Sequence, residues 1–152
     1  MRHDYAATVI RGRRGAALVE CALVLPFLLF LTLGVVEIGR MTRSQLALAQ
    51  ATREGSQAAA RGLTVVRIYG RIMNTASQGG LNRSAVTITD LSQSSNGNNW
   101  SMIGDSMDGS GNNARSRNLV RVTVHYRHAL LTTYVFRGGT RDLSCTLVSR
   151  RN

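Results

Sequence analysis

The chain is short and strongly basic. Its 152 residues are about one domain's worth, and an apolar run takes up part of that length, so the independently folding part must be small and a large catalytic scaffold is excluded. All 19 basic residues are arginine, against 8 acidic residues, and the formal net charge of +11 favours anionic partners such as phospholipid head groups or nucleic acid. With a single tryptophan and no nucleic-acid-binding motif, nucleic acid is not an expected partner.

A basic N-terminal stretch, residues 1–15, precedes the apolar run. Between residues 16 and 36 the only ionisable side chains are Glu20 and the thiol of Cys21. These 21 residues are close to the roughly 20 that a helix needs to cross a bilayer. Bulky residues crowd the only place where a signal peptidase could cut, so an ordinary signal peptide is disfavoured. Four arginines before the run against three after it favour a cytoplasmic N-terminus and an exported C-terminal part.

The membrane helix is predicted to continue through residues 37–61, to about Arg61. This stretch is rich in helix-forming residues and lacks proline. Small side chains recur on one face of it every three or four residues, at Ala47, Ala51, Gly55 and Ala58. Such a ridge permits close helix contact, either with the rest of its own domain or with a helix of another subunit.

Residues 62–152 are predicted to form a small exported α+β domain. An amphipathic helix over residues 64–77 is stopped by Gly79 and Gly80. Period-two alternation predicts the strands of a short antiparallel sheet at residues 85–89, 119–126, 133–136 and 143–149. Residues 90–118 are dense in serine, asparagine and glycine, and we expect them to form a functional or mobile loop.

A catalytic role has weak support. The sequence GDSMDG at residues 104–109 resembles the nucleophile motif of a known esterase class, with Ser106 in the nucleophile position. Such enzymes need a positioned histidine and oxyanion donors, and no Asp-x-x-His follows in this chain. We therefore predict that the protein is not an enzyme.

Two groups of polar residues are weak metal-site candidates. Oxygen ligands of the kind that Ca²⁺ requires lie among glycines, at a spacing unlike an EF-hand loop, at Asp105, Asp108, Asn112 and Asn113. A solvated turn is the favoured interpretation. His125 and His128 form an H-x-x-H without an evident third ligand. We predict no metal and no cofactor.

The two cysteines are predicted to be independent of each other. Cys21 lies in the membrane span and Cys145 near the far end of the exported part, so we exclude an intrachain disulfide. Cys145 alternates with Leu143 and Leu147 on the apolar face of the last strand. A buried free thiol is favoured there, and an intersubunit disulfide remains open.

Glu20 stands near the start of the apolar run, where a carboxylate needs a cationic partner. One partner is local, because Arg13 and Arg14 lie two turns before Glu20 and the side chain can reach the cytoplasmic interface. The other follows from spacing. If a peptidase cut after Gly15, Ala16 would become the amino terminus and Glu20 the fifth residue. This pattern resembles the type IV prepilins, in which a membrane aspartyl protease cuts behind a glycine and the glutamate neutralises a neighbouring subunit's amino terminus.

Several further features occur in register over residues 13–60: a glutamate and a proline in the apolar run, a Glu-x-Gly-Arg after it, and an Arg-Glu-Gly followed by alanines. They are Gly15, Glu20, Pro26, Glu37, Gly39, Arg40, Arg53, Glu54 and Gly55. In these features the chain resembles the TadE-like proteins of the tight-adherence (Tad, or Flp) pilus system. Cys21 departs from the family, in which an aromatic residue often follows the glutamate. Past residue 60 the resemblance is architectural.

The resemblance implies a minor pilin or pseudopilin that takes part in assembling a type IV-like pilus used in adhesion and biofilm formation. It implies a leader over residues 1–15, a transmembrane helix over 16–36, a periplasmic extension over 37–61 and a periplasmic domain over 62–152. The bacterial inner membrane would hold the chain, with the N-terminus in the cytoplasm. The implied partners are major and minor pilins, a prepilin peptidase, the inner-membrane assembly platform and membrane lipid.

Three matched residues have their own physical interpretation. Pro26 removes a backbone donor, which predicts a kink in the span. Glu37 and Arg40 are three residues apart at the outer interface and can form an ion pair, which would stabilise the helix by only a few tenths of a kcal/mol.

One alternative function remains, that of an uncleaved membrane-anchored protein whose basic exported domain binds an anionic ligand or surface.

Overall fold

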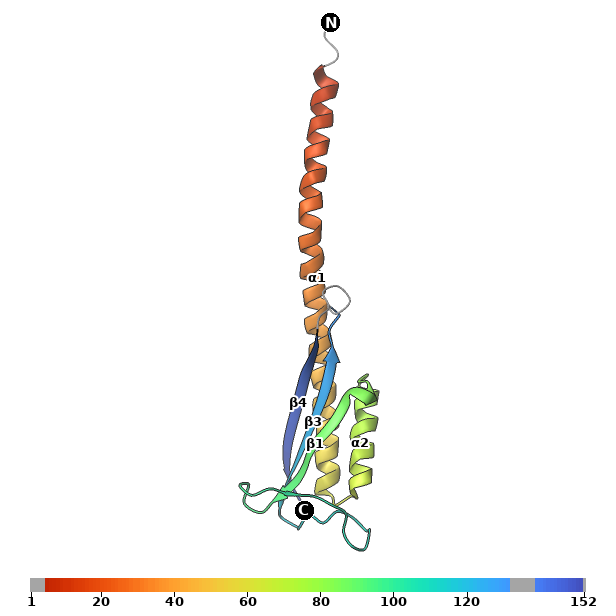
Figure 1. The fold of residues 1–152 in the computed structure, drawn as a ribbon, viewed down its shortest axis with the longest axis vertical. Coiled ribbons are helices and arrows are strands. Elements are labelled where there is room, and N and C mark those ends of the chain that lie inside the picture. Colours follow the sequence, from red (N-terminus) through yellow and green to blue (C-terminus); the bar gives the residue numbers. More distant parts are fainter. Residues whose placement is uncertain (1–4, 132–138, 152) are drawn as a thin grey trace. The chain divides into compact units, whose positions relative to one another are not determined.

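The computed structural model describes residues 5–131 and 139–151, with side chains described from residue 15 onward. The chain is α+β, as predicted, and divides into two compact units, Met1–Gly39 and Arg40–Asn152. The predicted strand at residues 133–136 lies outside the described residues. The elements are α1 (Tyr5–Ala60), α2 (Val65–Gln78), the 3₁₀ turn η1 (Arg83–Ala85), β1 (Val86–Ser94), β2 (Ser101–Met102), β3 (Leu119–Ala129) and β4 (Thr140–Arg150) (Figure 1).

The first unit consists of the N-terminal part of α1. From residue 15 onward its large apolar side chains are exposed apart from the half-buried Leu33, and none of the most hydrophobic stretch is buried within the structure. Within the described part of the chain, α1 is the one helix long and apolar enough to cross a membrane. Thr32 donates its hydroxyl to the carbonyl of Leu28 at 2.8 Å, so this polar group is satisfied inside the helix. The helix is unbroken through Pro26, and the predicted kink stays a prediction.

The second unit holds an antiparallel sheet in the order β2-β1-β3-β4. The long strand β3 lies at its centre and pairs with β4 from Leu119↔Arg150 to Ala129↔Thr140. Successive side chains of a pleated strand point to opposite faces of the sheet, so alternate residues of β3 are buried. Its valines occupy this buried face. That face carries Val120, Val122, Val124 and Tyr126, as the alternation predicted.

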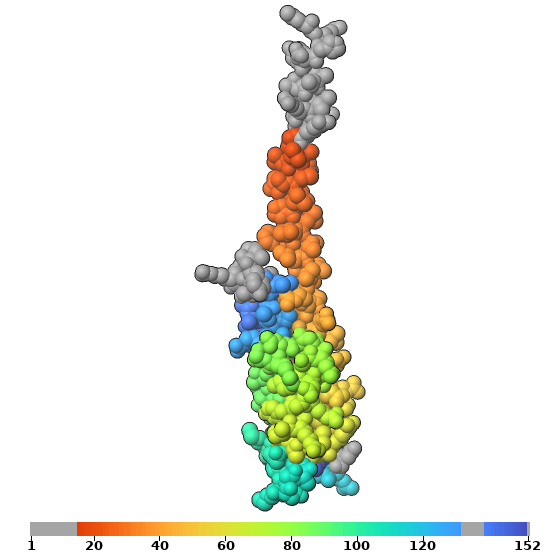
Figure 2. Space-filling model, turned by 90° about the vertical axis from the view of Figure 1, so that its right-hand side faces the viewer, coloured from red at the N-terminus to blue at the C-terminus, as the bar shows by residue number. Residues whose placement is uncertain are grey.

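The core lies between this face and two helices, α2 and the C-terminal part of α1 (Figure 1). The serine pair Ser56 and Ser149, whose hydroxyl oxygens are 2.7 Å apart, ties α1 to β4. Ile68 and Ile72 of α2 are fully buried, and the outer side of α2 forms part of the surface seen in Figure 2. The predicted amphipathic helix is therefore confirmed, shifted by one residue.

The ridge of small residues on α1 is buried inside this second unit. Ala47, Ala51 and Ala58 are at most 5 % exposed. A side chain added at Gly55 would collide with Ile72 of α2, and one added at Gly79 would collide with Ala47. Of the two partners that the sequence allowed, the structure shows the ridge packed against its own domain.

The segment 90–118 contains more regular structure than its composition predicted. Strand β1 continues to Ser94, and β2 then pairs back onto it through Ser92↔Met102. The alternating pattern was hidden because a bulge between Ile88 and Asp90 shifts the period, and because the buried residues past the bulge include serines. Further along, an isolated bridge joins Asp105 to Asn112.

Candidate functional site

The predicted processing site lies on the exposed surface of α1. Gly15, Ala16 and Glu20 are exposed, and Glu20 is four residues past Ala16, so both lie on the same face, about 6 Å apart along the axis. A glycine inside a helix costs about 1 kcal/mol relative to alanine. A side chain at Gly15 would meet nothing within 4 Å. Among the residues whose side chains the structure describes, packing therefore gives no reason for this glycine.

The other predicted positions near the membrane are separated by the boundary between the units. Glu37 is buried, whereas Arg40 begins the second unit and is exposed. Their ion pair stays a prediction. Cys21 is an exposed free thiol on α1. Cys145 is a half-buried free thiol in β4, opposite Val124 and against the core, so its intersubunit disulfide also stays a prediction.

Ser106 is hydrogen-bonded to a carboxylate. Its hydroxyl donates to Asp108 Oδ1 at 2.6 Å and also lies 3.0 Å from the carbonyl oxygen of Gly111. The Ser106 hydroxyl, together with the backbone and hydroxyl of Ser110, lowers the pKa of Asp108 to about 2. The carboxylate is therefore held ionised as an acceptor. His125 and His128, the two histidines in the described part of the chain, both lie on β3.

Asp105 caps a helix from a distance. Its Oδ1 accepts the backbone N–H of Val65 at 2.6 Å, and Thr64, the residue that precedes α2, makes no side-chain cap. A carboxylate at this end also interacts favourably with the helix dipole. Sequence reasoning missed this role because 40 residues separate the two partners.

We expect Asp105→Ala to destabilise the protein by about 1 kcal/mol, within the range of about 0.5–2 kcal/mol typical of a lost N-cap. Urea unfolding of the full chain in detergent micelles, followed by the fluorescence of its single tryptophan, measures this loss. Asp108→Ala is the matched control, since Asp108 bonds only to its own turn. Equal stability of the Asp105 variant and wild type would contradict the capping role.

Asn112 connects three segments. It is buried, and its Nδ2 donates to the carbonyls of Ala59 and Leu63, both at 3.0 Å, at the end of α1 and ahead of α2. Its Oδ1 lies 3.1 Å from a guanidinium nitrogen of Arg151. The residues that the sequence offered as Ca²⁺ ligands thus have separate structural roles. In the ranges 5–131 and 139–151 no three His, Cys, Asp or Glu side chains gather as a metal site would require.

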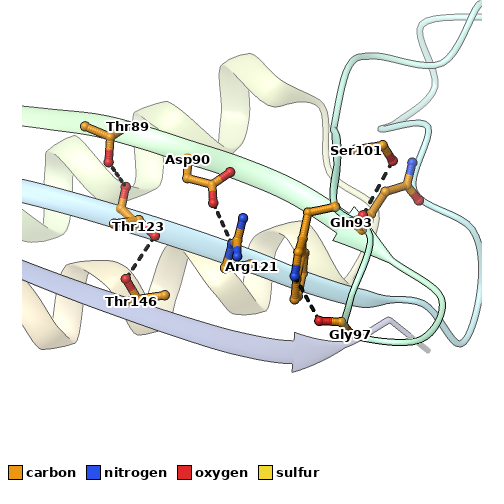
Figure 3. Close-up of polar contacts among 9 residues, drawn as sticks. Thr89, Asp90, Gln93, Gly97, Ser101, Arg121, Thr123 and Thr146 are labelled. Carbon is orange, nitrogen blue, oxygen red and sulfur yellow. Dashed lines mark hydrogen bonds and ion pairs between the residues drawn. The ribbon is translucent and has the colours of Figure 1, made fainter.

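The open face of the sheet carries a polar cluster that sequence reasoning missed (Figure 3). Arg121 of β3 donates to Asp90 of β1 at 2.6 Å, and the ring of Trp100 lies over its guanidinium, 4.2 Å away. Trp100 in turn donates its indole N–H to the carbonyl of Gly97 at 3.0 Å. Because the Asp90–Arg121 pair is partly exposed, we expect it to add little stability. Its evident effect is to hold the loop after β1 against the sheet.

Comparison with known protein families gives one result. Residues 15–57 match the family model of TadE-like proteins. This segment is TadE-like. The TadE-like match confirms the predicted family and contains Gly15, Glu20 and the small-residue ridge up to Gly55. It links the chain to Tad pilus systems and to their components in general, and the TadE-like family is not known to be enzymatic. No curated protein and no solved structure matches the chain.

Proposed function

We propose that the protein is a minor pilin or pseudopilin that takes part in assembling a Tad pilus. The observation that carries the proposal is the TadE-like match over residues 15–57, which contains both Gly15 and Glu20. The match starts at Gly15, directly before the residue that would become the amino terminus, and leaves out the preceding basic residues.

Assembly would rest on the exposed surface of α1 and on Glu20. The apolar side chains of the first unit are exposed, so lipid covers them in the membrane pool and other subunits' helices can cover them in a bundle. Cleavage after Gly15 creates an ammonium group at Ala16 in an apolar layer. Glu20 of a neighbouring subunit then supplies the carboxylate that neutralises it.

The remaining partners and the location belong to the same proposal. Residues 16–36 span the inner membrane, residues 37–61 extend the helix, and residues 62–152 form the periplasmic domain. The domain contacts major and minor pilins, and the assembly platform and prepilin peptidase act on the N-terminal segment. The pilus serves adhesion and biofilm formation.

Processing is tested by the N-terminus and intact mass of the protein extracted from cells with and without their prepilin peptidase. We expect a chain that begins at Ala16 only when the peptidase is present. Gly15→Leu is expected to abolish this processing. Gly34→Leu is the matched control, since Gly34 is another glycine of α1 with open space around it, and its processing should be normal.

A chain that keeps residues 1–15 in the presence of the peptidase would contradict the proposal. Glu20 would then be the interfacial partner of Arg13 or Arg14, whose side chains lie outside the described part of the structure. The leading function would become that of a membrane-anchored protein that binds an anionic ligand, and its binding would weaken with added salt.

A further inference from the structure

A small basic concavity lies at the start of the second unit. It has a volume of about 290 Å³ and is lined by residues of α1, of the turn after α2 and of β3. Its polar lining consists of Arg40, Arg43 and Ser44 of α1 with Tyr126 and His128 of β3. Hydroxyl, imidazole and guanidinium groups are donors that bind a phosphate oxygen, and none of the described lining residues carries a carboxylate.

The inner wall of the concavity is built from buried, mutually bonded side chains. His128 is 3 % exposed, and its Nδ1 lies 3.1 Å from the hydroxyl oxygen of Ser44. The ring of Tyr126 packs at a tilt against the His128 ring, with centroids 6.1 Å apart. The turn at Gly79 and Gly80 lies close to α1, because Gly79 packs against Ala47 without room for a side chain. Gly80 has a φ of +82°, a conformation that favours glycine. The site is therefore largely preformed.

Two arginines with like charges lie at the rim of the concavity. Arg40 and Arg43 are three residues apart on α1, so they lie on neighbouring positions of one face and repel each other. In the described ranges, the ion pairs of the second unit involve other arginines, Arg71, Arg121 and Arg127. A bound phosphate would relieve this repulsion and accept bidentate hydrogen bonds from each guanidinium.

Chain connectivity keeps Arg40 close to the end of the proposed span. Arg40 follows Val36, the last residue of the proposed span, by four residues. Even a fully extended chain covers at most about 14 Å over four residues, and a helix covers about 6 Å. Arg40 therefore stays near the layer of lipid head groups, whichever way the second unit is turned. A concavity of this size admits a head group but not acyl chains.

We propose that this concavity binds the phosphate of an anionic phospholipid head group. The proposal goes beyond the assembly function and does not depend on leader removal. It would give the subunit a specific lipid contact where its membrane helix enters the folded domain.

The test uses the full chain in detergent micelles, titrated with short-chain phosphatidylglycerol, with short-chain phosphatidylcholine and with glycerol phosphate. Native mass spectrometry counts the lipid molecules that stay bound. We expect one phosphatidylglycerol, held on the order of tenfold more tightly than phosphatidylcholine. The double variant Arg40→Gln, Arg43→Gln should lose this preference. The variant Arg61→Gln, Arg67→Gln removes the same charge from exposed positions elsewhere and should keep it.

A second pair of variants separates the concavity from diffuse charge. Ala129 lines it and is exposed. Ala129→Glu adds a competing carboxylate and should abolish the lipid preference, whereas Ala129→Gln should retain it. Three results would overturn the proposal: full retention in the Arg40, Arg43 variant, an equal loss in the Arg61, Arg67 variant, or binding of glycerol phosphate as tight as that of phosphatidylglycerol. N-terminal processing is measured separately, so either proposal can fail alone.

Discussion

Glu20→Gln is expected to prevent incorporation of the protein into the pilus while leaving its membrane insertion intact. Glutamine keeps the shape of the side chain and removes the charge that neutralises a neighbouring amino terminus. Removing one partner of a buried ion pair costs roughly 3–5 kcal/mol, because the other charge stays buried. That is more than about a hundredfold in an association constant. Immunoblots of sheared pili and of membrane fractions measure the two properties in the same cells.

Cys21→Ala is the matched control for Glu20→Gln. Cys21 is the next residue along the exposed surface of α1 and carries no charge as a thiol. Loss of pili in both variants would point to helix packing rather than to charge. Normal piliation in the Glu20 variant would exclude the pairing mechanism, even if Gly15 is processed.

The second helix was predictable because its apolar positions repeat with a helical period, and the first because a long apolar run is followed by helix-forming residues. The predicted extension to about Arg61 ends at Ala60, and the second helix ends directly before Gly79. Strand β3 was predictable because its valines alternate with the period of two that a strand requires. The extension of β1 was not predictable, because the bulge between Ile88 and Asp90 interrupts the alternation of apolar and polar residues.

The long-range contacts of the candidate sites were not predictable from sequence. The cap that Asp105 places on Val65 joins residues 40 positions apart, and the contact between Ser44 and His128 joins residues 84 apart. Neither contact leaves a periodic pattern. Glu20 and Gly15 are different, because their signal is a spacing within one helix. The proposed assembly site is therefore a prediction from sequence, whereas the basic concavity emerges only from the folded second unit.

Gly55→Ala is expected to destabilise the second unit, even though alanine favours a helix. The added methyl would collide with the side chain of Ile72, which is fully buried. Overpacking of this kind costs about 1–3 kcal/mol. Ile72→Ala alone leaves a cavity and should cost about 2–5 kcal/mol. In the double variant the new methyl enters the space that Ile72 has left. The double variant should therefore lose less stability than the two single variants together, by about 0.5–3 kcal/mol.

Urea unfolding of the full chain in micelles, followed by Trp100 fluorescence, gives the three free energies. Gly70→Ala is the control, since a methyl at Gly70 of α2 meets nothing within 4 Å and should stabilise the helix by about 0.5–1 kcal/mol. Additive costs at Gly55 and Ile72 would contradict the contact between them. Unchanged monomer stability with Gly55→Ala, together with lost assembly, would instead assign the ridge to contacts between subunits. The cycle therefore decides whether the small residues of the TadE-like segment fold the subunit or join it to its neighbours.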